Sequence, residues 1–255
     1  MTDTERLALD LARRAAAEIR DTARGAYRVS EKSGPGDLLT EADLRAEMAI
    51  RDLLREARPG DAVLAEESGF RPGSTGVTWI VDPLDGTANF VRDSPHYAVS
   101  VAAQSGERCL AAAIVRPADD QWMALREGAV EDHCAPPPPA AGPPRVAVAL
   151  PYGEEELEEA RTMLGLAGER YAIQRTGSAA CDLLRVASGT LDAHVAVALP
   201  WWDTAAGHAL VRAGGGTVAR LRSPRGTRVD VSGRPGAVRE LAALLAHGAR
   251  VREAA

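Results

Sequence analysis

The chain has 255 residues, of which 45% are hydrophobic, and a formal net charge of -6, so it is long enough to bury the core of one large domain or of two closely joined ones. The acidic balance argues against binding to a nucleic acid polymer or an anionic membrane, and a negatively charged substrate would need local help such as metal ions. Three widely spaced cysteines support neither a disulfide framework nor a cysteine-rich zinc site, and the absence of a signal-peptide core or a run of about 18 apolar residues predicts a soluble cytoplasmic protein.

The N-terminal segment predicts two helices separated by a loop. Residues 4–24 repeat apolar side chains at helical spacing, with arginine and glutamate on the opposite face. The Gly-Pro-Gly sequence at 34–36 predicts a loop, and Thr40 is expected to cap a second helix over 41–55. Asp43 then lies in the first turn of that helix.

The next segment predicts strands that end in acidic residues. The sequence AVLAEES at 62–68 is typical of a short strand ending in acid, and the apolar run of WIVDPLDGTANF at 79–90 stops at Asp82 and Asp85. Ligands of α/β folds bind at the carboxyl ends of strands, so a positively charged partner is expected there. The chain then predicts antiparallel strands over 97–104, 108–117 and 121–128.

The proline-rich stretch 134–145 is the predicted boundary between two subdomains, residues 1–140 and residues 145–255. Beyond it the pattern predicts alternating strands and helices, over 145–150, 154–166, 177–189 and 191–199. Asp203 is expected to be the N-cap of a further helix that ends in three glycines.

Acidic side chains at strand ends and helix starts are the candidate chemical groups: Glu66, Glu67, Asp82, Asp85 and Asp203. If several converge, like charges about 4 Å apart cost roughly 4 kcal/mol per pair at an intermediate dielectric constant. Protons or multivalent cations must therefore neutralise them. Oxygen ligands without nearby histidine or cysteine favour Mg²⁺ over zinc, and Mn²⁺ is able to substitute.

The hexapeptide from Asp82 to Thr87 also predicts a phosphate site. Pro83 fixes a turn, and Gly86 allows a ligand to approach the backbone closely. The amides of Gly86, Thr87 and Ala88 would form a helix N-terminus that can hold phosphate oxygens.

Five segments together resemble the inositol monophosphatase family, within the larger group of metal-dependent, lithium-sensitive phosphatases. They are DLLTEAD at 37–43, AEES at 65–68, WIVDPLDGTANF at 79–90, GSAA at 177–180 and WDTAAGHALVRAGGG at 202–216. They occur in the family's order across nearly the whole chain. The resemblance implies an α+β fold, a layered α/β/α/β/α sandwich, with the site between the two subdomains, and a homodimer.

The resemblance also implies roles for individual residues. A first metal would bind Glu66, Asp82, the carbonyl of Leu84 and Thr87; a second would bind Asp82, Asp85 and Asp203; a third would be reached from Glu66 through water. Asp43 with Thr87 would orient or deprotonate the attacking water, and the backbone of Gly86 and Thr87 would hold the phosphate. The reaction would be in-line attack of a metal-activated water, without a covalent phosphoenzyme.

Two positions depart from the family pattern and leave the substrate open. Members that act on inositol phosphate usually carry a glutamate seven positions before the motif aspartate, where this chain has Ala196. An arginine is common three residues before the motif glycine, where this chain has Gln174, with Arg175 next to it. A small polyol or sugar phosphate like inositol 1-phosphate is expected; the alternatives are a 3′(2′),5′-bisphosphate nucleotide, histidinol phosphate, and a regulatory binding protein that has kept a phosphatase fold.

Each candidate also has a purely structural interpretation. Asp203 could be only a helix cap, and Asp43 an exposed helix acid. Lys32 matches a family lysine but could equally be a solvated loop charge, and Glu67 could lie outside the direct metal contacts. The acidic run 154–159 is typical of a solvated helix face.

Overall fold

The computed structural model describes residues 2–32, 36–137, 142–151, 154–168, 170–223 and 225–252. Positions 34 and 35 of the predicted loop and positions 138–141 of the predicted boundary lie outside the described residues. Within these ranges no helix is long and apolar enough to cross a membrane.

The helices and strands follow one another along the whole chain. The helices are α1 Asp3–Ala23, α2 Glu41–Ala57, α3 Thr87–Val91, α4 Glu154–Gly168, α5 Ala179–Ala187, α6 Trp201–Ala213 and α7 Pro235–Arg252. The strands are β1 Val29–Glu31, β2 Leu38–Thr40, β3 Ala62–Ala65, β4 Gly69–Arg71, β5 Thr78–Asp85, β6 Ala98–Ser105, β7 Arg108–Val115, β8 Trp122–Arg126, β9 Ala129–His133, β10 Arg145–Ala149, β11 Ala172–Gln174, β12 Ala193–Val197, β13 Thr217–Arg222 and β14 Arg228–Gly233.

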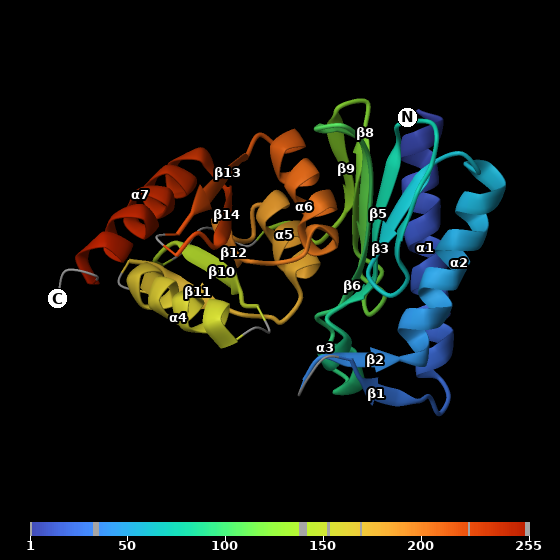
Figure 1. The fold of residues 1–255 in the computed structure, drawn as a ribbon, viewed down its shortest axis with the longest axis horizontal. Helices are drawn as coiled ribbons and strands as arrows, with labels where there is room; N and C mark the ends of the chain where they lie inside the picture. The colour runs from blue at the N-terminus through green and yellow to red at the C-terminus, as the bar shows by residue number, and fades with distance from the viewer. Residues whose placement is uncertain are drawn as a thin grey trace.

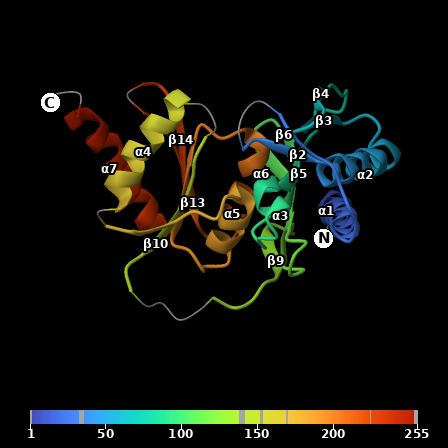
Figure 2. The same cartoon turned by 90° about the horizontal axis from the view of Figure 1, so that it is seen from below.

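These elements form a layered sandwich. Figure 1 shows α4 and α7 on one outer side, then a five-stranded sheet, then α5 and α6, then a seven-stranded sheet, and α1 with α2 on the other outer side. The same order is visible from below in Figure 2. The predicted α+β sandwich is confirmed.

The seven-stranded sheet has the order β4-β3-β5-β6-β7-β8-β9. Strands β3 and β5 are parallel, and the other neighbours in this sheet are antiparallel. The predicted antiparallel run after β5 is therefore confirmed. Because β3 and β5 run in the same direction, their carboxyl ends meet at one edge of the sheet, which brings Glu66 close to Asp82.

The first outer layer is set by capped amphipathic helices. Thr2 and Thr40 each accept a hydrogen bond from a backbone amide in the first turn of α1 and α2, and an acid three residues later bonds back to the cap. These capping boxes satisfy amides that would otherwise lack partners. The predicted cap at Thr40 is confirmed. Both helices bury their apolar faces against one face of the seven-stranded sheet, where Leu11, Ile19 and Ile50 lie in one core with Trp79 and Val101.

The middle layer joins the two sheets. Leu184 of α5 and Leu210 of α6 pack with Ile80 of the seven-stranded sheet, whereas Leu183 and Val211 face Ala147 of the five-stranded sheet, whose order is β11-β10-β12-β14-β13. The division into subdomains 1–140 and 145–255 stays a prediction. Helices α5 and α6 nevertheless follow the predicted boundary in sequence and pack on strands that precede it.

Gly207 lets the two middle helices approach closely. A Cβ atom at this position would lie 2.5 Å from the Cβ and Cδ1 of Leu183. Gly207→Ala is therefore expected to destabilise the fold by about 1–3 kcal/mol, because overpacking outweighs the gain in helix propensity. Urea unfolding measures the difference.

Gly165 of α4 is the matched control, because a Cβ there meets nothing within 4 Å. Gly165→Ala should be neutral or stabilising by up to about 1 kcal/mol. Equal effects of the two substitutions would contradict the close packing of α5 on α6.

Candidate active site

Asp82 and Asp85 end the buried strand β5 and lie on the same face of the sheet. Alternation along a regular strand would place residues three apart on opposite faces. A register shift in the pairing with β6 adds one residue here, so that Asp82 pairs with Ser100 and Asp85 with Ala98, two residues apart on β6. Both carboxylates therefore point, like Ile80, toward the layer of α5 and α6.

Burial and mutual repulsion perturb this pair. Asp82 is 1% exposed, and burial, followed by the charges of Glu66, Asp85 and Asp203, raises its pKa well above the ordinary value. Burial also raises the pKa of Asp85 to about 7.

Asp85 is tied to the start of α5 from across the sandwich. Its Oδ2 atom accepts hydrogen bonds of 2.6 Å from Ser178 Oγ and 2.6 Å from the Ala180 amide. These bonds lower the pKa of Asp85 and partly offset the effect of burial. The GSAA segment at 177–180 thus fixes the orientation of one candidate metal ligand.

Asp203 lies in the first turn of α6, but it is not the N-cap. The helix begins at Trp201 with Pro200 in the cap position, so the predicted N-cap role of Asp203 is wrong. Burial and then the charges of Asp85 and Glu66 raise the pKa of Asp203 well above its ordinary value. The carboxylate therefore faces the same space as Glu66 and Asp85, which a plain helix cap would not do.

Lys32 bridges the two glutamates that follow β3. Its Nζ atom lies 2.8 Å from Glu66 Oε1 and 2.5 Å from Glu67 Oε1. Burial alone would lower the pKa of Lys32, but the two carboxylates outweigh burial and raise it. The pKa of Glu67 rises to about 7, because its burial outweighs the contact with Lys32. Lys32 is therefore not a solvated loop charge.

Asp43 links the cap of α2 to the start of α3. Its Oδ2 atom accepts hydrogen bonds from the Thr40 amide at 2.8 Å and from Thr40 Oγ1 at 2.6 Å. Its Oδ1 atom accepts one of 2.9 Å from Thr87 Oγ1, which also lies 3.0 Å from the Leu84 carbonyl oxygen. Asp43 is 0% exposed, and burial raises its pKa although these bonds lower it. The interpretation of Asp43 as an exposed helix acid is wrong.

Gly86 allows the chain to turn from β5 into α3. Its φ of +93° is in the left-handed region, and a Cβ atom there would lie 2.7 Å from the His96 carbonyl oxygen. Helix α3 begins directly after it, at Thr87. The amides of Gly86, Thr87 and Ala88 therefore surround this turn, and their binding of phosphate stays a prediction.

The predicted substrate contacts lie in two different places. Arg175 lines a cavity of about 60 Å³ together with Asp85, Ser178 and Asp203. Ala196 is 2% exposed on β12 and packs with Ala179 and Leu199. The structure thus brings Arg175 to the carboxylates, whereas the methyl group of Ala196 offers no hydrogen-bonding atom.

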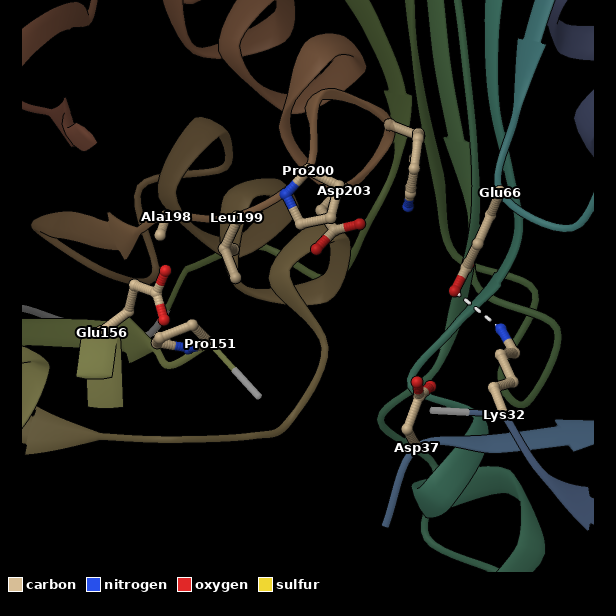
Figure 3. Close-up of a pocket in the computed structure, with 10 residues that line it drawn as sticks. Lys32, Asp37, Glu66, Pro151, Glu156, Ala198, Leu199, Pro200 and Asp203 are labelled. Atoms are coloured by element: carbon tan, nitrogen blue, oxygen red, sulfur yellow. Dashed lines mark hydrogen bonds and ion pairs between the residues drawn. The ribbon is translucent and has the colours of Figure 1, made fainter. Parts of the chain in front are cut away.

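A larger cavity of about 510 Å³ opens beside the carboxylates. It is lined by Lys32, Asp37, Glu66, Pro151, Glu156, Ala198, Leu199, Pro200, Trp202 and Asp203. Figure 3 shows Glu66 and Asp203 directed into it from different elements. Glu156 was missed in the sequence, because it is part of an acidic run that resembles a solvated helix face.

The donor set fits hard cations. Among the described residues no group of three or more His, Cys, Asp or Glu side chains is arranged so that it could hold a metal ion as placed. The charges of Glu66 and Asp85 nevertheless raise the pKa values of Asp82 and Asp203. Buried carboxylates that raise each other's pKa require neutralisation, by protons or by oxygen-binding cations such as Mg²⁺.

Comparison with known proteins gives the family of this fold and site. The family model described as "Inositol monophosphatase family" matches residues 1–252. The chain belongs to the inositol monophosphatase family.

Relatives within the inositol monophosphatase family carry two kinds of name. The chain is 35% identical over 238 residues to an inositol-1-monophosphatase of Mycobacterium bovis, covering 85% of this chain and 81% of the relative. It is 32% identical over 198 residues to the Nus factor SuhB of Escherichia coli K12, covering 74% of each. The crystal structure of the extragenic suppressor protein suhB from Bartonella henselae matches with a TM-score of 0.85 at 29% identity, over 97% of this chain and 100% of that one. The family supports a phosphatase and is generally metal-dependent.

Adding Mg²⁺ is expected to raise the melting temperature, because cations bound to the folded state offset the repulsion among the carboxylates. At about 100 times the dissociation constant the gain is roughly 2.7 kcal/mol, or about 5–10 °C for a chain of this size. Asp85→Asn should reduce this gain. Asp52→Asn, at an exposed carboxylate paired with Arg55 on α2, should leave it unchanged. An equal gain in both variants would contradict the shared cation site.

The gain from Mg²⁺ should also grow with pH. Because the pKa of Asp85 is raised to about 7, the metal-free folded protein holds protons that the unfolded chain releases near pH 4. The metal-free protein therefore loses stability as pH rises from about 4 to 7. Cations displace these protons, so melting curves at pH 5, 6, 7 and 8 should show an increasing gain. A gain that is constant over this range would contradict the raised pKa values.

Proposed function

We propose that this protein is a Mg²⁺-dependent phosphomonoesterase that hydrolyses a small polyol or sugar phosphate resembling inositol 1-phosphate. One observation carries the proposal: Asp82 and Asp85 of β5, Asp203 of α6 and Glu66 in the turn after β3 converge. They lie beside the hydrogen-bonded pair of Asp43 and Thr87. Mn²⁺ is expected to substitute for Mg²⁺, and Li⁺ to inhibit.

Two to three Mg²⁺ ions would be held by Glu66, Asp82, the carbonyl of Leu84, Asp85 and Asp203. Bound there, they supply the Lewis acidity that activates water and stabilises charge on the leaving oxygen. The contacts from Ser178 and Ala180 fix Asp85 through its Oδ2 atom. This arrangement leaves Oδ1 as the donor atom.

Asp43 and Thr87 would handle the proton of the attacking water. Thr87 has one hydroxyl proton for two acceptors, Asp43 Oδ1 and the Leu84 carbonyl. Donation to Asp43 leaves a Thr87 lone pair to receive a hydrogen bond from water and leaves the Leu84 carbonyl for a cation. Burial raises the pKa of Asp43, which makes this carboxylate a stronger base.

The phosphate would lie against the turn at Gly86. The amides of Gly86, Thr87 and Ala88 are the proposed donors to its oxygens, and the absence of a side chain at Gly86 lets the ligand approach the backbone. Arg175, beside Asp85 and Asp203, is the proposed cation near the phosphate or the leaving group. Ala196 offers no polar contact, so hydroxyl recognition would have to come from another residue.

Substitutions of the proton-handling pair should lower kcat more than they change KM. Asp43→Asn is expected to lower kcat about 10²–10⁴-fold, because it removes a general base. Thr87→Val should also cause a large loss, whereas Thr87→Ser keeps the hydroxyl and should keep most of the activity. Initial rates of phosphate release give both constants, with Asp52→Asn as the control. A kcat of Asp43→Asn equal to that of the wild type would contradict the proposed role of Asp43 as a general base.

Phosphate release from a substrate panel tests the reaction class and the substrate. The panel contains inositol 1-phosphate, histidinol phosphate and adenosine 3′,5′-bisphosphate, each with and without Mg²⁺. Turnover of inositol 1-phosphate that requires Mg²⁺ is the expected result. Faster turnover of either other compound would move the assignment to the corresponding alternative.

A regulatory binding function is a second candidate, favoured by the name of the relative "Nus factor SuhB" in Escherichia coli. Such a function would not need the carboxylates. It would replace the enzyme proposal if no panel member is turned over while Asp85→Asn leaves the cellular role intact.

The proposed cytoplasmic location follows from the few cysteines and the absence of a signal-peptide pattern in the sequence, and the proposed homodimer follows from the family resemblance. Sedimentation velocity at micromolar protein concentration measures the oligomeric state, and a monomer would contradict the dimer. Fractionation of the producing cells tests the location.

A further inference from the structure

The wall of the large cavity that faces Glu66 and Lys32 is formed by the start of α4 and the loop between β12 and α6. Most of this wall is apolar, from Pro151, Ala198, Leu199 and Pro200. Among the described residues of this wall, Glu156 carries the charge. Figure 3 shows Glu156 beside Pro151 and Ala198, across the cavity from Glu66 and Lys32.

The carboxylate of Glu156 has no hydrogen bond or ion pair within the described part of the chain, and the residue is half-buried. Glu158 provides a contrast on the same helix. Two residues further on, about 200° around α4, its side chain is 73% exposed and lies 3.4 Å from Arg225. Glu158 is a solvated surface acid, whereas Glu156 lines the cavity without a partner among the described residues.

The backbone fixes the shape of this wall. Ala198 has a φ of +53°, in the left-handed region that alanine rarely adopts. Its amide donates a hydrogen bond of 2.8 Å to the Arg228 carbonyl oxygen, and the Arg228 guanidinium donates to the Leu199 carbonyl oxygen. The loop beside Glu156 is therefore held from β14, and a ligand meets a preformed surface.

We propose that Glu156 selects the leaving group of the substrate by accepting a hydrogen bond from its hydroxyl or ammonium group and by repelling a second phosphate. The proposal rests on the proposed phosphomonoesterase function. An ionised carboxylate is an acceptor only, and its hydrogen bonds to hydroxyl and ammonium donors are charge-assisted. A phosphate placed beside it offers no donor and adds like charge.

The described residues that line the same cavity offer no free cation for a second phosphate. Lys32 is the basic residue among the described residues that line it, and its Nζ atom is held by Glu66 and Glu67. Arg175 lines the smaller cavity of about 60 Å³ instead. A leaving group rich in hydrogen-bond donors therefore fits this wall better than a bisphosphate nucleotide does.

The test compares kcat/KM on four phosphate esters in Mg²⁺. Inositol 1-phosphate presents hydroxyl groups, histidinol phosphate an ammonium group, and adenosine 3′,5′-bisphosphate a second phosphate. p-Nitrophenyl phosphate has a leaving group without a hydrogen-bond donor and serves as the reference for each variant. The variants are Glu156→Ala, Glu156→Gln and Glu156→Lys, and Glu158→Gln is the control on the same helix.

Each variant should change kcat/KM, taken relative to that for p-nitrophenyl phosphate, in a different way. Glu156→Ala is expected to lower it about five- to tenfold for inositol 1-phosphate and for histidinol phosphate, because one charge-assisted hydrogen bond is lost. Glu156→Gln keeps an acceptor but not the charge, so it should lower the value about tenfold for histidinol phosphate and less than about threefold for inositol 1-phosphate. Glu156→Lys should raise the value for the bisphosphate at least about fivefold.

The outcomes separate this inference from the proposed function. If the wild-type enzyme is active, and Glu156→Ala and Glu156→Lys change kcat/KM relative to p-nitrophenyl phosphate by less than about twofold, the role of Glu156 is overturned. The phosphatase proposal would still stand. Wild-type protein that releases phosphate from none of the four esters would overturn both. Equal changes in Glu158→Gln would assign the effect to the general charge of α4 and also overturn the role of Glu156. Melting curves of each variant verify that it is folded.

Discussion

The repulsion among buried carboxylates at the carboxyl ends of β3 and β5 is the constraint on which the rest of the structure depends. No single strand end can neutralise this charge. Lys32 approaches from the segment after β1 and bonds to Glu66, and the start of α5 holds Asp85 through Ser178. Helix α6 adds a further acid, Asp203. The site therefore needs the segment between β1 and β2, the seven-stranded sheet and the middle layer together, and the layered fold supplies all of them.

Local sequence patterns predict some elements of the fold and some residues of the candidate site. The cap at Thr40 and the helix after it follow from spacing within one turn, and Asp82 with Asp85 follow directly from an apolar run. Contacts between segments that are distant in sequence cannot be predicted from such local patterns. Ser178 bonds to Asp85 across 93 residues, and nothing in either segment alone indicates the other. Asp203 was predicted to be the N-cap, but α6 begins two residues before it, at Trp201. The two tryptophans give no capping signal that would reveal this earlier start. Strands β13 and β14 were not predicted, because exposed β13 alternates arginine with half-buried residues instead of showing a clear apolar face.

Pro83 indicates an irregularity in the pairing of β5 that hydrophobic periodicity does not reveal. Strand β5 is an interior strand, between β3 and β6, where a residue without an amide proton is disfavoured unless the pairing is irregular. The register shift between Asp82 and Asp85 is such an irregularity. It reverses the alternation, so that Leu84 faces the core under α1 and α2 while both aspartates face the middle layer. A proline inside a central strand thus explains why two acids three residues apart act on one side.

The reaction and the substrate depend on different elements. The carboxylates are fixed by the sheet edge, by Ser178 and by Lys32, all held by contacts with one another. The opposite wall of the cavity is formed by the loop at Ala198 and by the start of α4, which contribute none of the candidate metal ligands. A change of side chain at Glu156 therefore alters the surface that meets the leaving group without removing a partner from any carboxylate of the site. In the proposed function, a single carboxylate at this wall distinguishes hydrogen-bond donors from like charge, so a substitution there can change the choice of substrate while the acids proposed to perform the hydrolysis keep their arrangement.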